Sequence, residues 1–167
     1  NISWQKINSY KNEIVFHSVL NPVDGYGSSA EQLVKHLSKN ASISWDGQKR
    51  NDNWRNDTSP EASSRLWKGN GKHLIAYTVP NIGGPLFSRS HTNTFYTMWE
   101  SSKPPIFWKD QINIYDRLIV PCKQNVKAFK DLGVNVPVHE VGLGVDEKFW
   151  AYKERSTKGK TRFLMFA

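Results

Sequence analysis

Residues 97–150 read TMWESSKPPIFWKDQINIYDRLIVPCKQNVKAFKDLGVNVPVHEVGLGVDEKFW, and they decide the fold class of this chain. Three strand-like runs end within this stretch in polar or glycine-rich loops. The runs cover residues 94–99, 117–121 and 136–141. Open α/β sheets bind ligands where strands give way to loops at their carboxyl ends. The stretch therefore predicts one rim of a binding cleft.

Helices are predicted between these strands. A helix is expected near 106–115, after Pro104-Pro105. Val126, Phe129 and Leu132 recur at helical spacing, and Gly133 is a residue type that commonly ends a helix. Strands that alternate with helices imply parallel pairing through right-handed crossovers. We therefore expect an α/β fold with a doubly wound, mostly parallel, Rossmann-like sheet.

The first half of the chain continues the alternation. Residues 13–20, EIVFHSVL, form a compact apolar run that is typical of a buried strand. Ser28 and Glu31 match a capping box, which predicts a helix after Ser28. Strands are also expected at 43–45 and 73–79, a loop over 46–58, and a short helix from Ser59-Pro60.

Residues 1–152 are predicted to form one domain. Residues 153–162, KERSTKGKTR, indicate a basic linker, or else a segment that attracts a phosphate-bearing ligand. Residues 161–167, TRFLMFA, are typical of a buried strand. A strand that opens a βα unit without its helix is incomplete. We therefore expect residues 153–167 to lead into a second domain, and the chain to be part of a longer protein.

The composition favours a folded domain with anionic partners. Hydrophobic residues make up 38% of the 167 residues and aromatic residues 13%, enough to offset the entropy cost of ordering the chain. The 23 basic and 15 acidic residues give a net charge of +8. That charge favours nucleic acid, phosphorylated small molecules or an acidic membrane surface.

No apolar stretch reaches the roughly 18–20 residues that span a bilayer. The first residues lack the apolar middle of a signal peptide. Cys122 is the only cysteine, which excludes an intrachain disulfide and suits a reducing compartment. We expect a cytoplasmic protein, with peripheral membrane contact left open. The histidines show no metal-ligand spacing, so no metal is expected.

Two loops contain candidate binding residues. Gly25 and Gly27 precede the predicted helix, whose N-terminus could hold an anion, although an ordinary βα turn would use the same residues. Trp99 could stack on a sugar ring while Glu100 accepts hydrogen bonds from its hydroxyls; a core tryptophan and a solvated glutamate are the alternative. A third loop, 142–146, suits a bend that Asp146 caps.

Taken in order, these residues resemble the N-terminal domain of GT-B-type glycosyltransferases, most closely the retaining family 4. The resemblance covers nearly the whole chain. It rests on Asp24-Gly-Tyr-Gly-Ser-Ser29, Thr97-Met-Trp-Glu-Ser101, Leu118-Ile-Val-Pro121 with Asn125 and Phe129, and Gly142-Leu-Gly-Val-Asp146 with Phe149.

The resemblance implies a hexosyltransferase-type enzyme that moves a sugar from a nucleotide-sugar to a sugar or glycan acceptor with retention and without a metal. The N-terminal domain holds the acceptor, and a C-terminal domain, in cis or as a separate chain, holds the donor. Gly25, Tyr26, Gly27 and Ser28 would lie near the acceptor or the donor phosphate; Trp99, Glu100 and Ser101 would face the reacting sugar; Gly142, Gly144 and Asp146 would lie at the interdomain hinge.

The chain departs from the family pattern at two points. Many members have a histidine where this chain has Trp99-Glu100, so no catalytic residue is assigned. The donor-site Glu-x7-Glu pair is also missing, since no two glutamates are eight positions apart. We therefore expect little or no transfer activity from this chain alone.

Two other classes of protein compete with this hypothesis. A non-enzymatic basic α/β module would bind anionic polymers such as nucleic acid, with strong salt dependence. Its basic and aromatic residues are not clustered on one element, which argues against nucleic acid. A dinucleotide-dependent oxidoreductase is the least favoured, because Ala30 stands where G-x-G-x-x-G needs its last glycine and no acidic residue ends the second strand.

Overall fold

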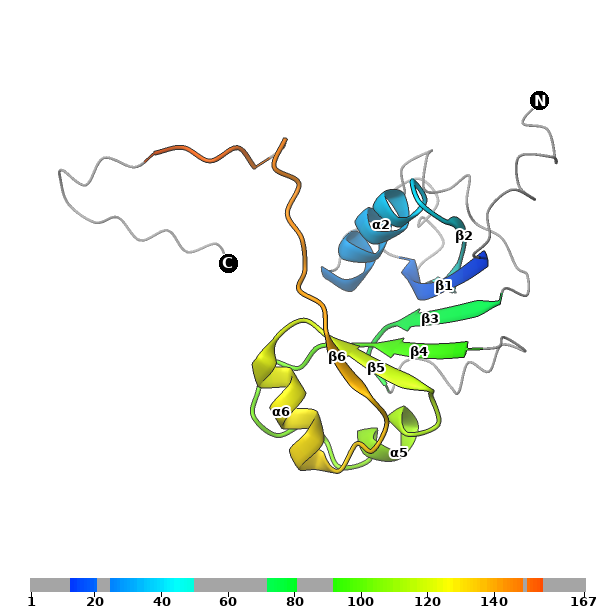
Figure 1. Cartoon of the computed structure of the whole chain (residues 1–167), viewed down its shortest axis with the longest axis vertical. Helices are drawn as coiled ribbons and strands as arrows, with labels where there is room; N and C mark the ends of the chain where they lie inside the picture. Colours follow the sequence, from blue (N-terminus) through cyan, green and yellow to red (C-terminus); the bar gives the residue numbers. More distant parts are fainter. Residues whose placement is uncertain (1–12, 21–24, 50–71, 81–91, 149, 155–167) are drawn as a thin grey trace.

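The computed structural model describes residues 13–20, 25–49, 72–80, 92–148 and 150–154. Its described strands form one sheet, in which every pair of neighbours is parallel and the order is β2-β1-β3-β4-β5-β6 (Figure 1). The elements are β1 (Glu13–Leu20), α2 (Gly25–Leu37), β2 (Ser42–Lys49), β3 (His73–Tyr77), β4 (Thr92–Tyr96), α5 (Trp108–Ile112), β5 (Arg117–Val120), α6 (Lys123–Leu132) and β6 (Val138–Glu140).

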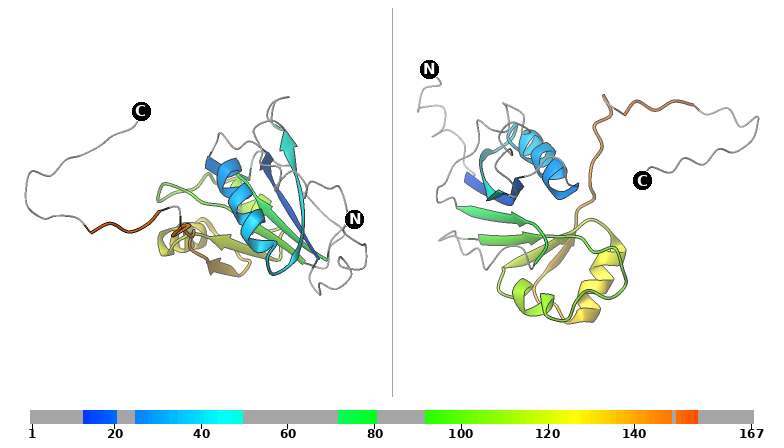
Figure 2. Two further views of the ribbon diagram at one scale, coloured as in Figure 1. Left: turned by 90° about the horizontal axis from the view of Figure 1, so that it is seen from above. Right: turned by 180° about the vertical axis from the view of Figure 1, so that it is seen from behind.

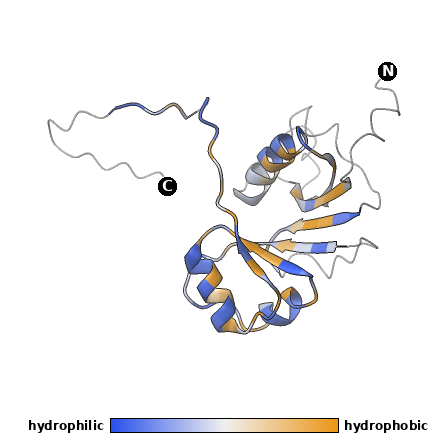
Figure 3. Ribbon diagram, viewed as in Figure 1, coloured by the Kyte–Doolittle hydropathy of each residue, from blue (hydrophilic) through white to orange (hydrophobic). Residues whose placement is uncertain are grey.

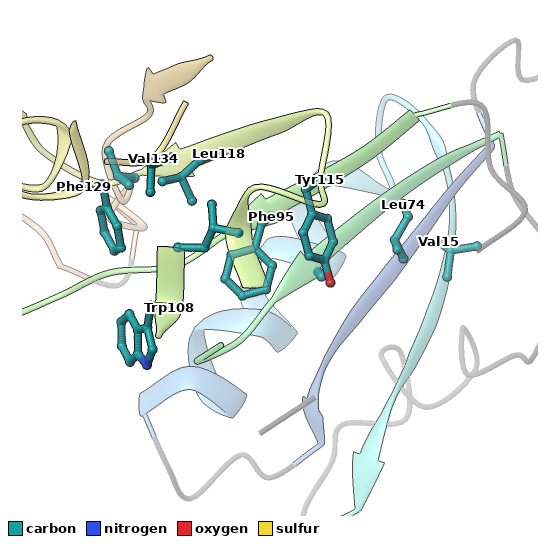
Figure 4. Close-up of a cluster of buried hydrophobic side chains, with 11 residues drawn as sticks. Val15, Leu74, Phe95, Trp108, Tyr115, Leu118, Phe129 and Val134 are labelled. Carbon is teal, nitrogen blue, oxygen red and sulfur yellow. The ribbon is translucent and has the colours of Figure 1, made fainter. Parts of the chain in front are cut away.

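Alternating side chains of the strands build a separate core on each face of the sheet. Phe95 lies in the cluster that contains Trp108 and Ile112 of α5 and Phe129 of α6 (Figure 4). Tyr96, the next residue of β4, lies in the cluster that α2 covers. This alternation is the period of two that a strand imposes on its side chains. The central strands are therefore buried on both faces, and the predicted α/β, doubly wound, Rossmann-like fold is confirmed.

The hydropathy of the sequence follows these two layers. Apolar residues gather along the strands, whereas α2 and α6 carry hydrophilic residues on much of their surface (Figure 3). Parallel strands covered on both faces are expected to read as nearly continuous apolar runs. The described part of β1 has this character, with Val15, Phe16 and Val19 all buried.

β2 and β4 depart most from the boundaries that the sequence predicts, and β3, β5 and β6 are shorter than expected by one to three residues. β2 continues through residues 46–49, where a loop is expected, because it pairs with β1 along its whole length. It lies at the edge of the sheet, where polar residues are tolerated. β4 ends at Tyr96 instead of Trp99, because the side chains of Tyr26 and Asn125 take over the backbone hydrogen bonds of residues 98 and 99.

The end of α6 is confirmed. Gly133 has φ 94° and a left-handed backbone conformation, which a residue with a Cβ adopts only at a cost. Its N–H donates to the carbonyl of Lys130, and the N–H of Val134 donates to the carbonyl of Phe129. These bonds satisfy carbonyl groups that the end of a helix would otherwise leave open.

Several predictions fall outside the described residues. They are the helix from Ser59-Pro60, the loop over 50–58 and the strand at 161–167. The division of the chain at residue 152 also stays a prediction. Among the described residues, no helix is long and apolar enough to cross a membrane.

Candidate functional site

The order in which strands are added to the sheet reverses between β1 and β3. The chain moves outward from β1 to β2, and then returns to the other side of β1, so β3 and all later strands lie there (Figure 2). Crevices at the carboxyl ends of strands on either side of such a switch point are the usual ligand sites of open α/β sheets. In this chain α2 begins just beyond the carboxyl end of β1, at Gly25.

Gly25, Tyr26, Gly27 and Ser28 lie in the first turn of α2 instead of in a loop. The predicted capping box is therefore wrong, since Ser28 lies inside the helix. Neither glycine has a positive φ, so the chain does not use their conformational freedom here. Glycine has a lower helix propensity than most residues. The hydrogen bonds of Tyr26 to residues 97 and 98 offset the resulting loss of helix stability.

Tyr26 joins the first turn of α2 to the loop after β4. Its hydroxyl oxygen accepts a hydrogen bond from the N–H of Met98 at 3.2 Å. It also lies 3.2 Å from the Oγ1 of Thr97 and 3.4 Å from the carbonyl oxygen of Met98, which gives its own proton two possible acceptors. Thr97 is fully buried. The start of α2 and the loop after β4 are thus held together beneath the surface.

Asn125 holds the same loop from the other side. Its Oδ1 accepts from the N–H of Trp99 at 2.9 Å, and its Nδ2 donates to the carbonyl of Trp99 at 2.7 Å. The Asn125 side chain belongs to α6 and only 2% of the residue is exposed. The amide group therefore substitutes for a neighbouring strand at the point where β4 has ended.

The members of the Trp99–Glu100–Ser101 triplet lie differently. The ring of Trp99 is partly buried and packs edge-on against Trp108, with 4.9 Å between ring centroids. Its Nε1 is buried and has no hydrogen-bond partner among the described residues. Trp99 thus has the packing of a core tryptophan. Glu100 and Ser101 are exposed, so they are the two that can meet a ligand.

The segment after β6 is anchored where it leaves the sheet. The N–H of Val141 donates to the carbonyl of Val120 at 2.8 Å, and the hydroxyl of Tyr96 donates to the carbonyl of Val141 at 3.2 Å. Gly142 and Gly144 follow in an exposed stretch and neither has a positive φ.

Asp146 then caps a turn, as predicted. Its Oδ1 accepts from the N–H of Lys148 at 3.0 Å. Its carbonyl accepts from the N–H of Trp150 at 2.8 Å. Both bonds lie within the exposed segment, so they shape it without tying it to the sheet.

Tyr26, Tyr77 and Tyr96 pack against one another beside the candidate site. The ring centroid of Tyr77 lies 5.1 Å from that of Tyr26 and 4.8 Å from that of Tyr96. The hydroxyl of Tyr77 is 2.8 Å from the Oγ of Ser29, which also donates to the carbonyl of Gly25 at 2.6 Å. α2 and β3 therefore meet through hydroxyl groups, and β4 joins them through the packing of Tyr96 against Tyr77.

These hydroxyl groups stay protonated near neutral pH. Burial raises the pKa of Tyr77 to about 12. Burial also raises the pKa of Tyr26, against the opposing hydrogen bond of Thr97, and the charge of Glu100 adds to the rise. The pKa of Tyr96 is raised, first by burial and then by the charge of Tyr26. The three tyrosine hydroxyls are therefore neutral hydrogen-bond donors and acceptors and add no charge to the site.

Sequence reasoning missed Tyr77, Tyr96 and Ser29 as parts of the site. A usable signal was present, because Tyr77 and Tyr96 are the last residues of their strands and occupy paired positions on one face of the sheet. Two tyrosines at the carboxyl ends of neighbouring strands are well placed to reach the helix that follows β1.

No group of three or more histidine, cysteine, aspartate or glutamate side chains within the described ranges could hold a metal ion. Comparison with known proteins adds no family assignment. No protein-family model matches the sequence, no curated protein matches it significantly, and no solved structure does so either.

Proposed function

We propose that this chain is the acceptor-binding domain of a retaining, GT-B-type glycosyltransferase. One observation supports this most strongly. Three of the four segments that carry the motif resemblance converge at the carboxyl ends of the strands. Tyr26 connects the first turn of α2 to the loop after β4, and Tyr96 connects β4 to the segment after β6.

The exposed groups at this edge suit an acceptor with hydroxyl groups. Glu100 can accept hydrogen bonds from sugar hydroxyls, and the hydroxyls of Ser28 and Ser101 can both donate and accept. All three residues are exposed, whereas the bonds that hold them in place are buried or partly buried. Such a site, with polar groups on a rigid support, loses little conformational entropy on binding.

In the proposed reaction an acceptor oxygen bonds to the anomeric carbon of the donor sugar while the bond from that carbon to the nucleotide phosphate breaks. The departing phosphate oxygen keeps the electron pair and takes up the proton that the acceptor hydroxyl gives up. This domain would orient the acceptor hydroxyl. A second domain, joined to this chain or separate from it, would bind the nucleotide-sugar. The net charge of +8 favours the approach of that phosphate-bearing substrate.

An NMR titration of the 15N-labelled chain tests this function. Monosaccharides and oligosaccharides are added first, then nucleotide-sugars, then single-stranded DNA. We expect saccharides to shift the amide signals of Tyr26, Glu100 and Ser101. Tight DNA binding that weakens steeply with salt, together with no response to any saccharide, would contradict the proposal and favour a module that binds anionic polymers.

A further inference from the structure

A groove separates α2 from the segment that follows β6, which passes beside that helix (Figure 2). Its volume is about 650 Å³. Sites for small ligands commonly measure about 300–1,000 Å³. The groove is therefore large enough for a ligand of that class.

The two walls of the groove differ in chemistry. Most of the α2 side chains in the groove carry hydrogen-bonding groups, among them Ser28, Gln32 and His36, although Leu33 also lines it. The opposite segment is mostly apolar, with Leu143, Val145 and Trp150, and also contributes Asp146. Trp150 is 68% exposed. An exposed tryptophan opposite a row of polar side chains matches a ligand that has one apolar face and a polar edge.

We propose that this groove binds a saccharide, as the second sugar unit of an oligosaccharide acceptor. A sugar ring presents an apolar face of C–H groups, which Trp150 can cover, and an edge of hydroxyl groups. The amide of Gln32 can donate to and accept from such hydroxyls, and so can the hydroxyl of Ser28. The proposal rests on the proposed function and names its substrate class, an acceptor of at least two sugar units.

The positions on α2 support a ligand that extends along the helix. Ser28, Gln32 and His36 are four residues apart, which places them on one face of the helix. The helix rises about 12 Å over these eight residues. Ser28 lies in the first turn of α2, as does Tyr26, whose hydroxyl is hydrogen-bonded to the loop that carries Glu100. In the proposal, the sugar next to the one at Glu100 enters the groove at its Ser28 end.

The test compares monosaccharide and disaccharide binding by the full chain and its variants, using the same sugars in NMR and calorimetric titrations. Disaccharides are expected to shift the indole signal of Trp150 and the side-chain amide of Gln32, and to bind more tightly than monosaccharides. Trp150→Ala and Gln32→Ala should each weaken disaccharide binding about tenfold, a change of ~1.4 kcal/mol, and leave monosaccharide binding unchanged.

Two exposed residues outside the groove, Tyr152 and Gln111, provide matched controls. Tyr152 is 89% exposed, lies on the same segment and does not line the groove, so Tyr152→Ala should bind normally. Gln111→Ala, an exposed position on α5, controls for loss of an amide.

The outcomes separate this inference from the proposed function. Saccharide binding at Glu100 that gains nothing from a second sugar, and that ignores Trp150→Ala, would overturn the groove site and leave the proposed function standing. Absence of binding by every saccharide would count against both. A protein domain that shifts the groove signals where no saccharide does would replace the proposal with a docking surface.

Discussion

The side-chain amide of Asn125 closes two hydrogen bonds on the backbone of Trp99, one to its N–H at 2.9 Å and one to its carbonyl at 2.7 Å. The pair extends the hydrogen bonding of the sheet beyond the end of β4. It also sets the direction in which Glu100 and Ser101 leave the core, and so connects α6 to the candidate site.

Asn125→Leu should lower the free energy of unfolding by about 2–4 kcal/mol, because it leaves two backbone groups without partners. Urea denaturation measures this change. Asn135→Ala is the control, since Asn135 is an exposed asparagine. A loss no larger than that of the control would show that the two hydrogen bonds contribute little.

Tyr26→Phe should cost about 1–2 kcal/mol, because the N–H of Met98 loses its acceptor while the ring keeps its packing. The same substitution at Tyr152, which is 89% exposed, should have no effect on stability. Hydrogen exchange at the Met98 amide gives a local readout. Unchanged protection of that amide in Tyr26→Phe would argue that the hydroxyl does not hold the loop.

Stability should fall at high pH as the buried tyrosines ionise. The pKa of Tyr77 is raised to about 12 by burial, and the pKa values of Tyr26 and Tyr96 are also raised. A pKa that is higher in the folded state means that the unfolded chain releases its proton first. The contribution of Tyr77 is therefore complete below about pH 10 and is lost as the pH rises towards 12.

Spectroscopic titration of tyrosinate and denaturation at several alkaline pH values check this prediction together. Tyr77→Phe should reduce the loss of stability between pH 10 and 12. If Tyr77 ionised with the pKa of a free tyrosine, the packing of the three rings would have to be looser than the structure shows.

Gly133→Ala should destabilise the chain by about 1–2 kcal/mol, because φ 94° is unfavourable for a residue with a Cβ. The new Cβ would also lie 3.2 Å from the Cδ of Lys109. Gly144→Ala is a matched control, since nothing lies within 4 Å of its added Cβ and its φ is not positive. Equal melting temperatures for the two variants would contradict the assigned C-cap.

Glu100→Gln should weaken saccharide binding about tenfold, the effect of losing ~1.4 kcal/mol of charge-assisted hydrogen bonding. Stability should not change, because Glu100 is exposed. Asp110→Asn, at an exposed position of α5, controls for the change in net charge. Calorimetry measures the saccharide affinity of both variants. Equal affinities would show that Glu100 does not bind the saccharide.

The order and type of the elements could be predicted from sequence because they depend on local patterns. Buried strands such as 117–120 are continuous apolar runs, and Gly133 marks the end of α6. The start of α2 could not be predicted in the same way. Its first turn contains two glycines and is stabilised by Tyr26, whose partners lie more than 70 residues away.

The same distinction between local patterns and tertiary contacts explains why only part of the candidate site could be predicted. Glu100 and Ser101 are exposed in a loop after a strand, as the motif suggested. Trp99 instead packs against Trp108, a tertiary contact that the residues immediately beside Trp99 in the sequence do not indicate. The roles of Tyr77 and Asn125 likewise depend on how the strands and helices meet.

A transfer assay tests the central claim most directly. Radiolabelled nucleotide-sugars and an oligosaccharide panel are incubated with the chain alone, and with the chain joined to a C-terminal domain whose donor binding is verified separately. The proposed function predicts no turnover by the chain alone and turnover by the joined protein. Robust transfer by the chain alone, or none by a joined protein that binds its donor, would contradict it.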